Sequence, residues 1–101
     1  MLPKEKRLTR ADFTALERGK RVITPHFSCT KQSSPFLKVA VVVSKKVAKK
    51  ATDRHLLKRR VIASIHKNPP QAGYYCIYAR KGSELLSFAQ LDAEITTLLR
   101  L

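Results

Sequence analysis

The hydrophobic residues of the chain first indicate three stretches of β-structure. Residues 22–31 are mostly β-branched, aromatic or small, and Pro25 within them predicts a short edge piece followed by a strand over residues 26–31. Residues 36–44 contain the uninterrupted run Val-Ala-Val-Val-Val, which predicts a strand buried on both faces in the middle of a sheet. Residues 74–79 combine aromatic and aliphatic side chains and predict a further strand.

Capping signals predict a first and a last helix. Thr9 followed by Asp12 is a loose capping box, and Gly19 is placed to end a short first helix. Ser87 followed by Gln90 is a second capping box, which begins the last helix. The apolar residues that recur at helical spacing after it, and that we expect in the core, are Phe88, Leu91, Ile95, Leu98 and Leu99.

A third helix is predicted over residues 51–67. Leu57, Val61 and Ile65 are spaced by four and form one apolar stripe, which we expect to pack on the sheet. Thr52 or Asp53 can cap its amino end. The chain therefore reads helix, strands, helix, strand, helix. This order predicts a single α+β domain over residues 1–101, with helices packed on a sheet of three or four strands.

Charge changes this picture from a generic domain to a candidate nucleic-acid binder. The chain has 21 Lys and Arg residues against 7 Asp and Glu, a formal net charge of +14. Half of the sixteen residues from 45 to 60 are Lys or Arg, so the charge is concentrated on the helix and its lead-in. We expect Arg54, Lys58 and Arg59 to face away from the core toward phosphate.

The sequence favours a soluble protein over a membrane protein. No apolar run approaches the roughly 20 residues that span a bilayer, and the first ten residues lack the hydrophobic segment of a secretory signal, so we expect a cytoplasmic protein. Cys29 and Cys76 are isolated, which predicts reduced thiols, and no Cys/His spacing resembles a metal site.

The residues that could carry catalysis are few. The acidic side chains are scattered or lie in first turns of predicted helices, where the helix dipole accounts for them. His26 and His66 are expected to be solvated, and His55 lies among basic residues, where hydrogen bonding to nucleic acid is its expected role. We therefore expect no independent catalytic centre, no metal site and no bound cofactor.

Three motifs in order resemble the protein subunit of bacterial ribonuclease P. They are Val43-Ser44-Lys45-Lys46, the run Ala-Thr-Asp-Arg-His at 51–55 leading to Lys58-Arg59, and Ile-Tyr-Ala-Arg-Lys at 77–81. The resemblance implies the order αβββαβα, with an unusual left-handed βαβ crossover through the basic helix. It also implies that an RNA subunit, with magnesium, is the catalyst. The protein would bind that RNA and hold the 5′ leader of precursor tRNA in a cleft beside the sheet.

The resemblance assigns two sets of residues. The RNA-binding set is Ser44, Lys45, Lys46, Lys49, Lys50, Arg54, His55, Lys58 and Arg59. The leader-binding cleft set is Phe13, Phe27, Arg80 and Lys81. Some positions depart from the usual family pattern: His55 stands in place of Asn, Leu56 and Ile62 in place of Arg, and Thr30 in place of a frequent Tyr.

Two other functions fit a small basic protein. A structural RNA-binding protein, such as a small ribosomal protein, has similar size and charge, but has no reason to share the three motifs. A protein-only nuclease would need an acidic or histidine centre that the sequence lacks. The expected partners are therefore ribonuclease P RNA and precursor tRNA, bound by a monomer.

The substitution at residue 55 yields a direct test. If His55 hydrogen-bonds RNA as the Asn of the family does, His55→Asn preserves RNA affinity at fixed salt and His55→Ala weakens it. Filter binding of the three proteins to ribonuclease P RNA measures this difference. Equal affinities would show that residue 55 makes no contact.

Overall fold

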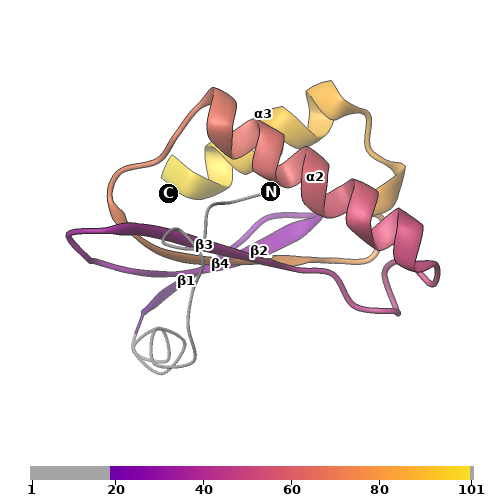
Figure 1. The fold of residues 1–101 in the computed structure, drawn as a ribbon, viewed down its shortest axis with the longest axis horizontal. Coiled ribbons are helices and arrows are strands. Elements are labelled where there is room, and N and C mark those ends of the chain that lie inside the picture. The colour runs from indigo at the N-terminus through magenta and orange to yellow at the C-terminus, as the bar shows by residue number, and fades with distance from the viewer. Residues whose placement is uncertain (1–18, 101) are drawn as a thin grey trace.

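The computed structural model describes residues 19–100, so the predicted first helix, with Phe13, lies outside the described residues. Figure 1 shows the arrangement of the elements. They are β1 (Lys20–Ile23), β2 (Phe27–Gln32), β3 (Leu37–Val42), α2 (Ala51–Lys67), β4 (Gly73–Ala79), the 3-10 helix η2 (Ser83–Leu85) and α3 (Phe88–Arg100). The predicted strands and the last helix are confirmed with boundaries shifted by one or two residues, and the basic helix is confirmed with its predicted bounds.

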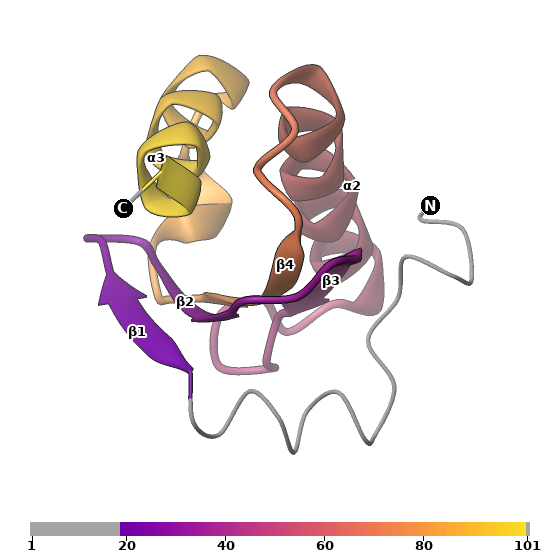
Figure 2. The same cartoon turned by 90° about the vertical axis from the view of Figure 1, so that its left-hand side faces the viewer.

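The four strands form one mixed sheet in the order β1-β2-β4-β3. β2 pairs antiparallel with β1 and β4, whereas β3 pairs parallel with β4. In Figures 1 and 2, β3 and β4 point the same way, α2 lies above them, and β4 lies to the left of β3 when the strands run away from the viewer. The β3–α2–β4 crossover is therefore left-handed, the rare hand for parallel strands.

The prediction that residues 36–44 form a central strand is wrong. β3 pairs only with β4 and lies at one edge of the described sheet. Its apolar run serves only one buried face: Val39 is buried, Val41 packs partly against the core, and Val42 is exposed on the other face. The central strands are β2 and β4, which pair with each other although they lie far apart in the sequence.

Both helices cover the same face of the sheet (Figure 2). The strand register directs alternate residues of β2 and β4 toward them, with Phe27 opposite Ala79 and Cys29 opposite Ile77. These side chains meet the apolar stripes of α2 and α3. The buried helical residues in this core are Leu57, Val61, Ile62, Ile65, Leu91, Ile95, Leu98 and Leu99.

The amino ends of the two helices differ. The capping box of α3 is confirmed, because Gln90 donates its backbone N–H to Ser87 Oγ at 3.2 Å and Ser87 donates to Gln90 Oε1 at 3.0 Å. Phe88, however, is 40% exposed and not a core residue. At α2, neither Thr52 nor Asp53 is the N-cap, because the helix begins at Ala51 and places both in its first turn.

The second prediction contrasts neighbouring leucines of α2. Leu57 is 3% exposed and Leu56 is 48% exposed, so only Leu57→Ala leaves a cavity. We expect Leu57→Ala to lower the free energy of unfolding by about 2–5 kcal/mol. Leu56→Ala should change it by no more than about 0.5 kcal/mol. Urea denaturation of both variants measures this, and equal losses would contradict the burial of the Leu57 side of α2.

Candidate nucleic-acid interface

The loop of residues 43–50 directs apolar side chains inward and lysines outward. Val47 and Ala48 both donate their backbone N–H to the carbonyl of Ser44, at 3.1 and 3.2 Å, which closes a tight turn. Val43 and Ala48 are buried, and Val47 packs partly against the core. The exposed residues are Ser44, Lys45, Lys46, Lys49 and Lys50.

The first half of α2 continues this charged region. His55 and Arg59 are exposed, whereas Arg54 and Lys58 are half-buried. We use the name basic surface for nine exposed or half-buried residues of the loop and the first half of α2, which are Ser44, Lys45, Lys46, Lys49, Lys50, Arg54, His55, Lys58 and Arg59. All nine sequence-predicted RNA-binding residues thus lie on one loop and the helix that follows it.

One member of the basic surface does not lie as expected. Arg54 was predicted to face away from the core, but its Nη1 donates to the carbonyls of Ala48 at 3.1 Å and Lys49 at 2.8 Å. At 100° per residue, Arg54 falls about 60° from Leu57, on the same side as Val61. The side chain is therefore drawn back along the helix to the preceding loop.

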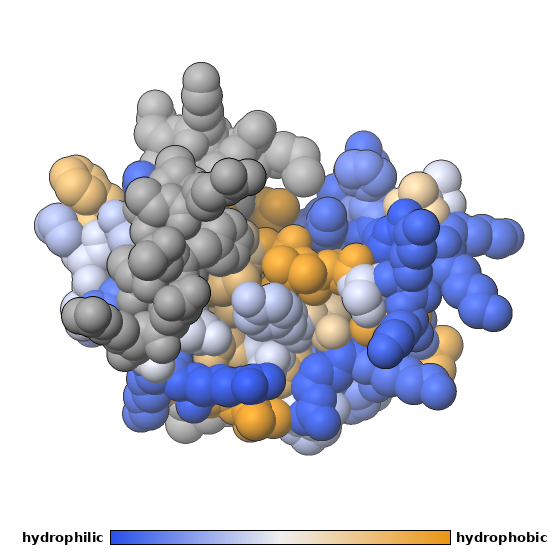
Figure 3. Space-filling model, turned by 90° about the horizontal axis from the view of Figure 1, so that it is seen from below, coloured by the Kyte–Doolittle hydropathy of each residue, from blue (hydrophilic) through white to orange (hydrophobic). Residues whose placement is uncertain are grey.

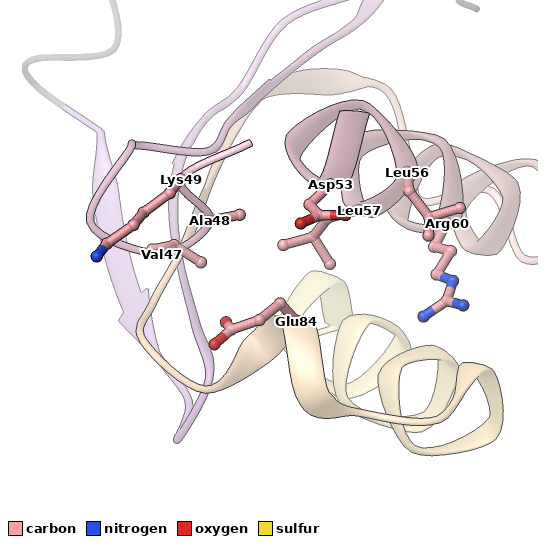
Figure 4. A pocket seen from close by; sticks show the side chains of 8 residues that line it. All are labelled: Val47, Ala48, Lys49, Asp53, Leu56, Leu57, Arg60 and Glu84. Carbon is pink, nitrogen blue, oxygen red and sulfur yellow. The ribbon is translucent and has the colours of Figure 1, made fainter. Parts of the chain in front are cut away.

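A cavity of about 380 Å³ lies beside the basic surface (Figure 4). The loop, α2 and η2 all contribute to it, and its charged lining residues are Lys49, Asp53, Arg60 and Glu84. Arg60 is half-buried there. Its apolar walls are Val47, Ala48, Leu56 and Leu57.

The sheet face that points away from α2 and α3 is a second candidate region. Register and alternation direct Thr30, Cys76 and Ala40 to this face in one row, and Tyr78 with Val42 in the next. Tyr78 is 40% exposed. The pKa of Tyr78 is raised to about 12, mainly by a side-chain hydrogen bond with Cys76 and to a smaller extent by burial. Figure 3 shows hydrophobic residues near the middle of this face and hydrophilic residues to their right and below them. We call it the second sheet face.

The predicted leader-binding cleft is only partly consistent with this arrangement. Phe27 is fully buried beneath the helices, so its assignment to a cleft is wrong. Its pairing with Ala79 directs its ring toward the core. The local sequence does not indicate which face of β2 the helices cover. Arg80 and Lys81 are exposed just beyond β4, and Arg80 Nη1 donates to the carbonyl of Thr24 at 2.9 Å. Phe13 lies outside the described residues.

Sequence reasoning missed the residues that β3 and β4 direct toward the second sheet face. Tyr78 was only one of seven aromatic residues, and nothing singled out Cys76 or Val42. Alternation along residues 74–79 separates Tyr74, Cys76 and Tyr78 from their neighbours, but only the pairing with β2 shows that this set faces away from the helices. Tyr74 contributes a further contact, because Lys38 Nζ lies 5.7 Å from the centre of its ring.

A polar network fixes the end of the sheet near Arg80. Glu94 of α3 accepts hydrogen bonds from Thr24 Oγ1 at 2.7 Å and from the His26 backbone N–H at 2.8 Å, and its other oxygen lies 2.8 Å from His26 Nδ1. Arg80 donates its backbone N–H to the carbonyl of His26 at 2.8 Å. The expectation that His26 is solvated is therefore wrong, because it joins the β1–β2 turn to α3.

The cysteines are free thiols, as predicted. Cys29 faces the core and Cys76 faces the second sheet face, so the two side chains lie on opposite sides of the sheet. Burial raises the pKa of Cys29 to about 12 and raises that of Cys76. Neither thiol is therefore an activated nucleophile.

Within residues 19–100, no helix combines the length and apolar character required to cross a membrane. The same part of the chain has no group of three His, Cys, Asp or Glu side chains that could hold a metal ion.

Comparison with known proteins identifies the family. The model of the Ribonuclease P family matches residues 2–101, and the chain belongs to this family. The fold is similar to that of the Staphylococcus aureus RNase P protein, with a TM-score of 0.83 and 22% identity over 96% of this chain and 94% of that one. It is also similar to the Thermotoga maritima RNase P protein, with a TM-score of 0.83 and 23% identity over 94% of this chain and 96% of that one.

A search of curated proteins found no match. Membership of the family supports the role of a ribonuclease P protein subunit in tRNA processing and implies an RNA partner, the ribonuclease P RNA. The match favours this role over that of a small ribosomal protein.

The third prediction concerns the carboxylate of Glu94. Burial alone would raise the pKa of Glu94, but hydrogen bonds from His26 and Thr24 outweigh burial, so its pKa is lowered from 4.5. A lowered pKa in the folded state stabilises the protein above pH 4.5, and this contribution is lost as pH falls through the folded-state pKa. Glu94→Gln should therefore cost about 1–3 kcal/mol at pH 7. The difference from the unmodified protein should shrink toward pH 3.

Chemical denaturation between pH 3 and pH 7 checks this expectation. Asp92→Asn is the matched control for Glu94→Gln, because the pKa of Asp92 is also lowered. The largest cause of that shift is the hydrogen bond from Ser64. A Glu94→Gln penalty that stays constant across this range would contradict the hydrogen-bonded carboxylate.

Proposed function

We propose that this protein binds ribonuclease P RNA through the basic surface and contacts the 5′ leader of precursor tRNA through the second sheet face. In this account the RNA cleaves the precursor, and the protein contributes binding and orientation. The single observation that carries the proposal is the concentration of exposed and half-buried cations on the loop and the first half of α2, in a chain of the Ribonuclease P family.

Charge supports the RNA-binding part of the proposal. Lysines of the loop and Arg59 of α2 are exposed, and none of them makes a side-chain hydrogen bond or ion pair in the described residues. Such cations bind a phosphate backbone and release counterions, so the affinity should fall as salt rises. A rigid helix and a closed turn hold these charges in a fixed pattern, which lowers the entropy cost of binding a structured RNA.

The second sheet face supports the leader-binding part. An exposed aromatic ring on a sheet can stack on an unpaired base, a contact worth about 1–3 kcal/mol. Tyr78 is such a ring, and Arg80 and Lys81 lie exposed just beyond the same strand. Thr30 lies in the neighbouring row and cannot stack, so the aromatic contact falls to Tyr78 among the described residues of β2 and β4 at that end.

The protein's own residues supply no catalytic step in this proposal. Among the described carboxylates, Asp92 is bound to Ser64 and Lys67, and Glu94 is bound to Thr24 and His26. Magnesium would act with the RNA subunit, and we assign no protein ligand to it because the described residues offer no cluster of three donors.

Processing of precursor tRNA tests the proposal. We expect the protein to increase 5′ cleavage by its cognate ribonuclease P RNA at low magnesium, and to cleave nothing when the RNA is omitted. Arg59→Glu should weaken RNA binding about tenfold, equivalent to about 1.4 kcal/mol. Arg100→Glu is the matched control, because it makes the same charge change on an exposed residue of α3.

Two outcomes would contradict the proposal. An unchanged cleavage rate with the RNA at low magnesium would remove the subunit function, and cleavage without RNA would indicate a protein catalyst. Equal losses for Arg59→Glu and Arg100→Glu would show that net charge alone, and not the basic surface, determines binding.

A further inference from the structure

Arg54 occupies an electrostatically unfavourable position. It lies in the first turn of α2, where the unpaired N–H groups carry partial positive charge. The lysines at positions 45, 46, 49 and 50 of the preceding loop add further positive charge around it. A cation at this point destabilises the helix end unless other contacts offset the repulsion.

Two hydrogen bonds to the loop provide that offset. Nη1 of Arg54 donates to the carbonyl of Ala48 at 3.1 Å and to that of Lys49 at 2.8 Å. Both acceptors lie just before Lys50, the N-cap of α2. The guanidinium therefore joins the end of the loop to the helix, and it is half-buried in doing so.

Arg59 provides the contrast within the same helix. It is exposed, and in the described part of the chain its side chain makes no hydrogen bond or ion pair. From these different surroundings we propose that Arg54 is a positioning residue, which holds residues 44–50 in place for RNA, whereas Arg59 contacts phosphate directly. This inference rests on the proposed function and divides the basic surface into two roles.

The loop explains why such a residue matters. Its turn is closed by the N–H groups of Val47 and Ala48 on the carbonyl of Ser44, and Ala48 is its buried anchor. Arg54 adds the connection to α2, so the loop lysines keep a fixed position relative to Arg59. Without this connection the lysines would still contact RNA, but the entropy cost of ordering the loop on binding would reduce the affinity.

The salt dependence of RNA binding distinguishes the two roles. The plot of log affinity against log salt has a negative slope. Arg59→Ala should make this slope shallower by about one unit, because one phosphate contact is lost. Arg54→Ala should weaken binding about five- to tenfold at every salt concentration, because ordering costs carry no counterion term, and leave the slope unchanged. The probe is ribonuclease P RNA transcribed from the same organism.

Hydrogen exchange in the free protein gives a second readout that needs no RNA. Arg54→Ala should accelerate exchange of the Val47 and Ala48 amides, which close the turn, and Arg59→Ala should leave both unchanged. If Arg54→Ala does not fold, Arg54→Lys takes its place, because it retains the charge but lacks the planar guanidinium. It should also accelerate exchange of the two amides.

The outcomes are distinct. The positioning role would be overturned if Arg54→Ala made the salt dependence of RNA affinity shallower by about one unit and left hydrogen exchange of the Val47 and Ala48 amides unchanged. Unchanged exchange in Arg54→Lys would overturn it as well. If even the unmodified protein fails to bind RNA, the proposed function fails, while the exchange rates still decide how Arg54 acts on the loop.

Discussion

The burial of one narrow stripe of α2 against the sheet is the interaction on which the rest of the structure depends. Leu57, Val61 and Ile65 are almost wholly buried, while the remaining circumference of the first half of the helix is largely charged. Isolated helices of this length are marginal in water, and like charges at adjacent turns weaken them further. The sheet therefore supplies the stability that the charged sequence of α2 cannot supply itself.

The β3–α2–β4 crossover places the basic loop beside the first turns of α2. Because β3 and β4 are parallel, the chain must return along the sheet, and α2 is the segment that returns. The loop before α2 consequently lies beside its first turns, where Arg54 bonds to the loop carbonyls. At the same end, Glu94 ties the β1–β2 turn to α3. Hydrogen bonds to backbone carbonyls and to the Glu94 carboxylate thus fix the backbone at this end, and the loop lysines remain exposed.

Sequence reasoning was reliable where the signal is local. The basic helix was predicted because apolar residues recur at a spacing of four from Leu57 to Ile65, and the Ser87–Gln90 capping box is a contact between neighbours. It was unreliable where pairing decides the outcome. The apolar run at 39–43 resembles a central strand, and only the strand order shows that β3 lies at an edge.

The same distinction applies to the candidate site. The exposed lysines follow from composition, whereas Phe27 and Tyr78 could not be sorted between core and surface without the β2–β4 register. Arg54 was misjudged for another reason. At 100° per residue Arg54 falls on the same side of α2 as Leu57 and Val61, so the projection contradicts the outward direction that its charge suggested. Its guanidinium is satisfied there by a carbonyl six residues earlier in the chain.

The central claim, that RNA lies against the loop and the first turns of α2, is open to direct mapping. Both native cysteines are buried with raised pKa values, so a single introduced cysteine can carry a tethered iron chelate that cleaves nearby RNA. Ala51 is exposed and uncharged within the basic region, and Ala93 is its counterpart on α3. The account predicts localised cleavage of ribonuclease P RNA from Ala51→Cys and none from Ala93→Cys. Strong cleavage from Ala93→Cys, with none from Ala51→Cys while binding persists, would contradict it.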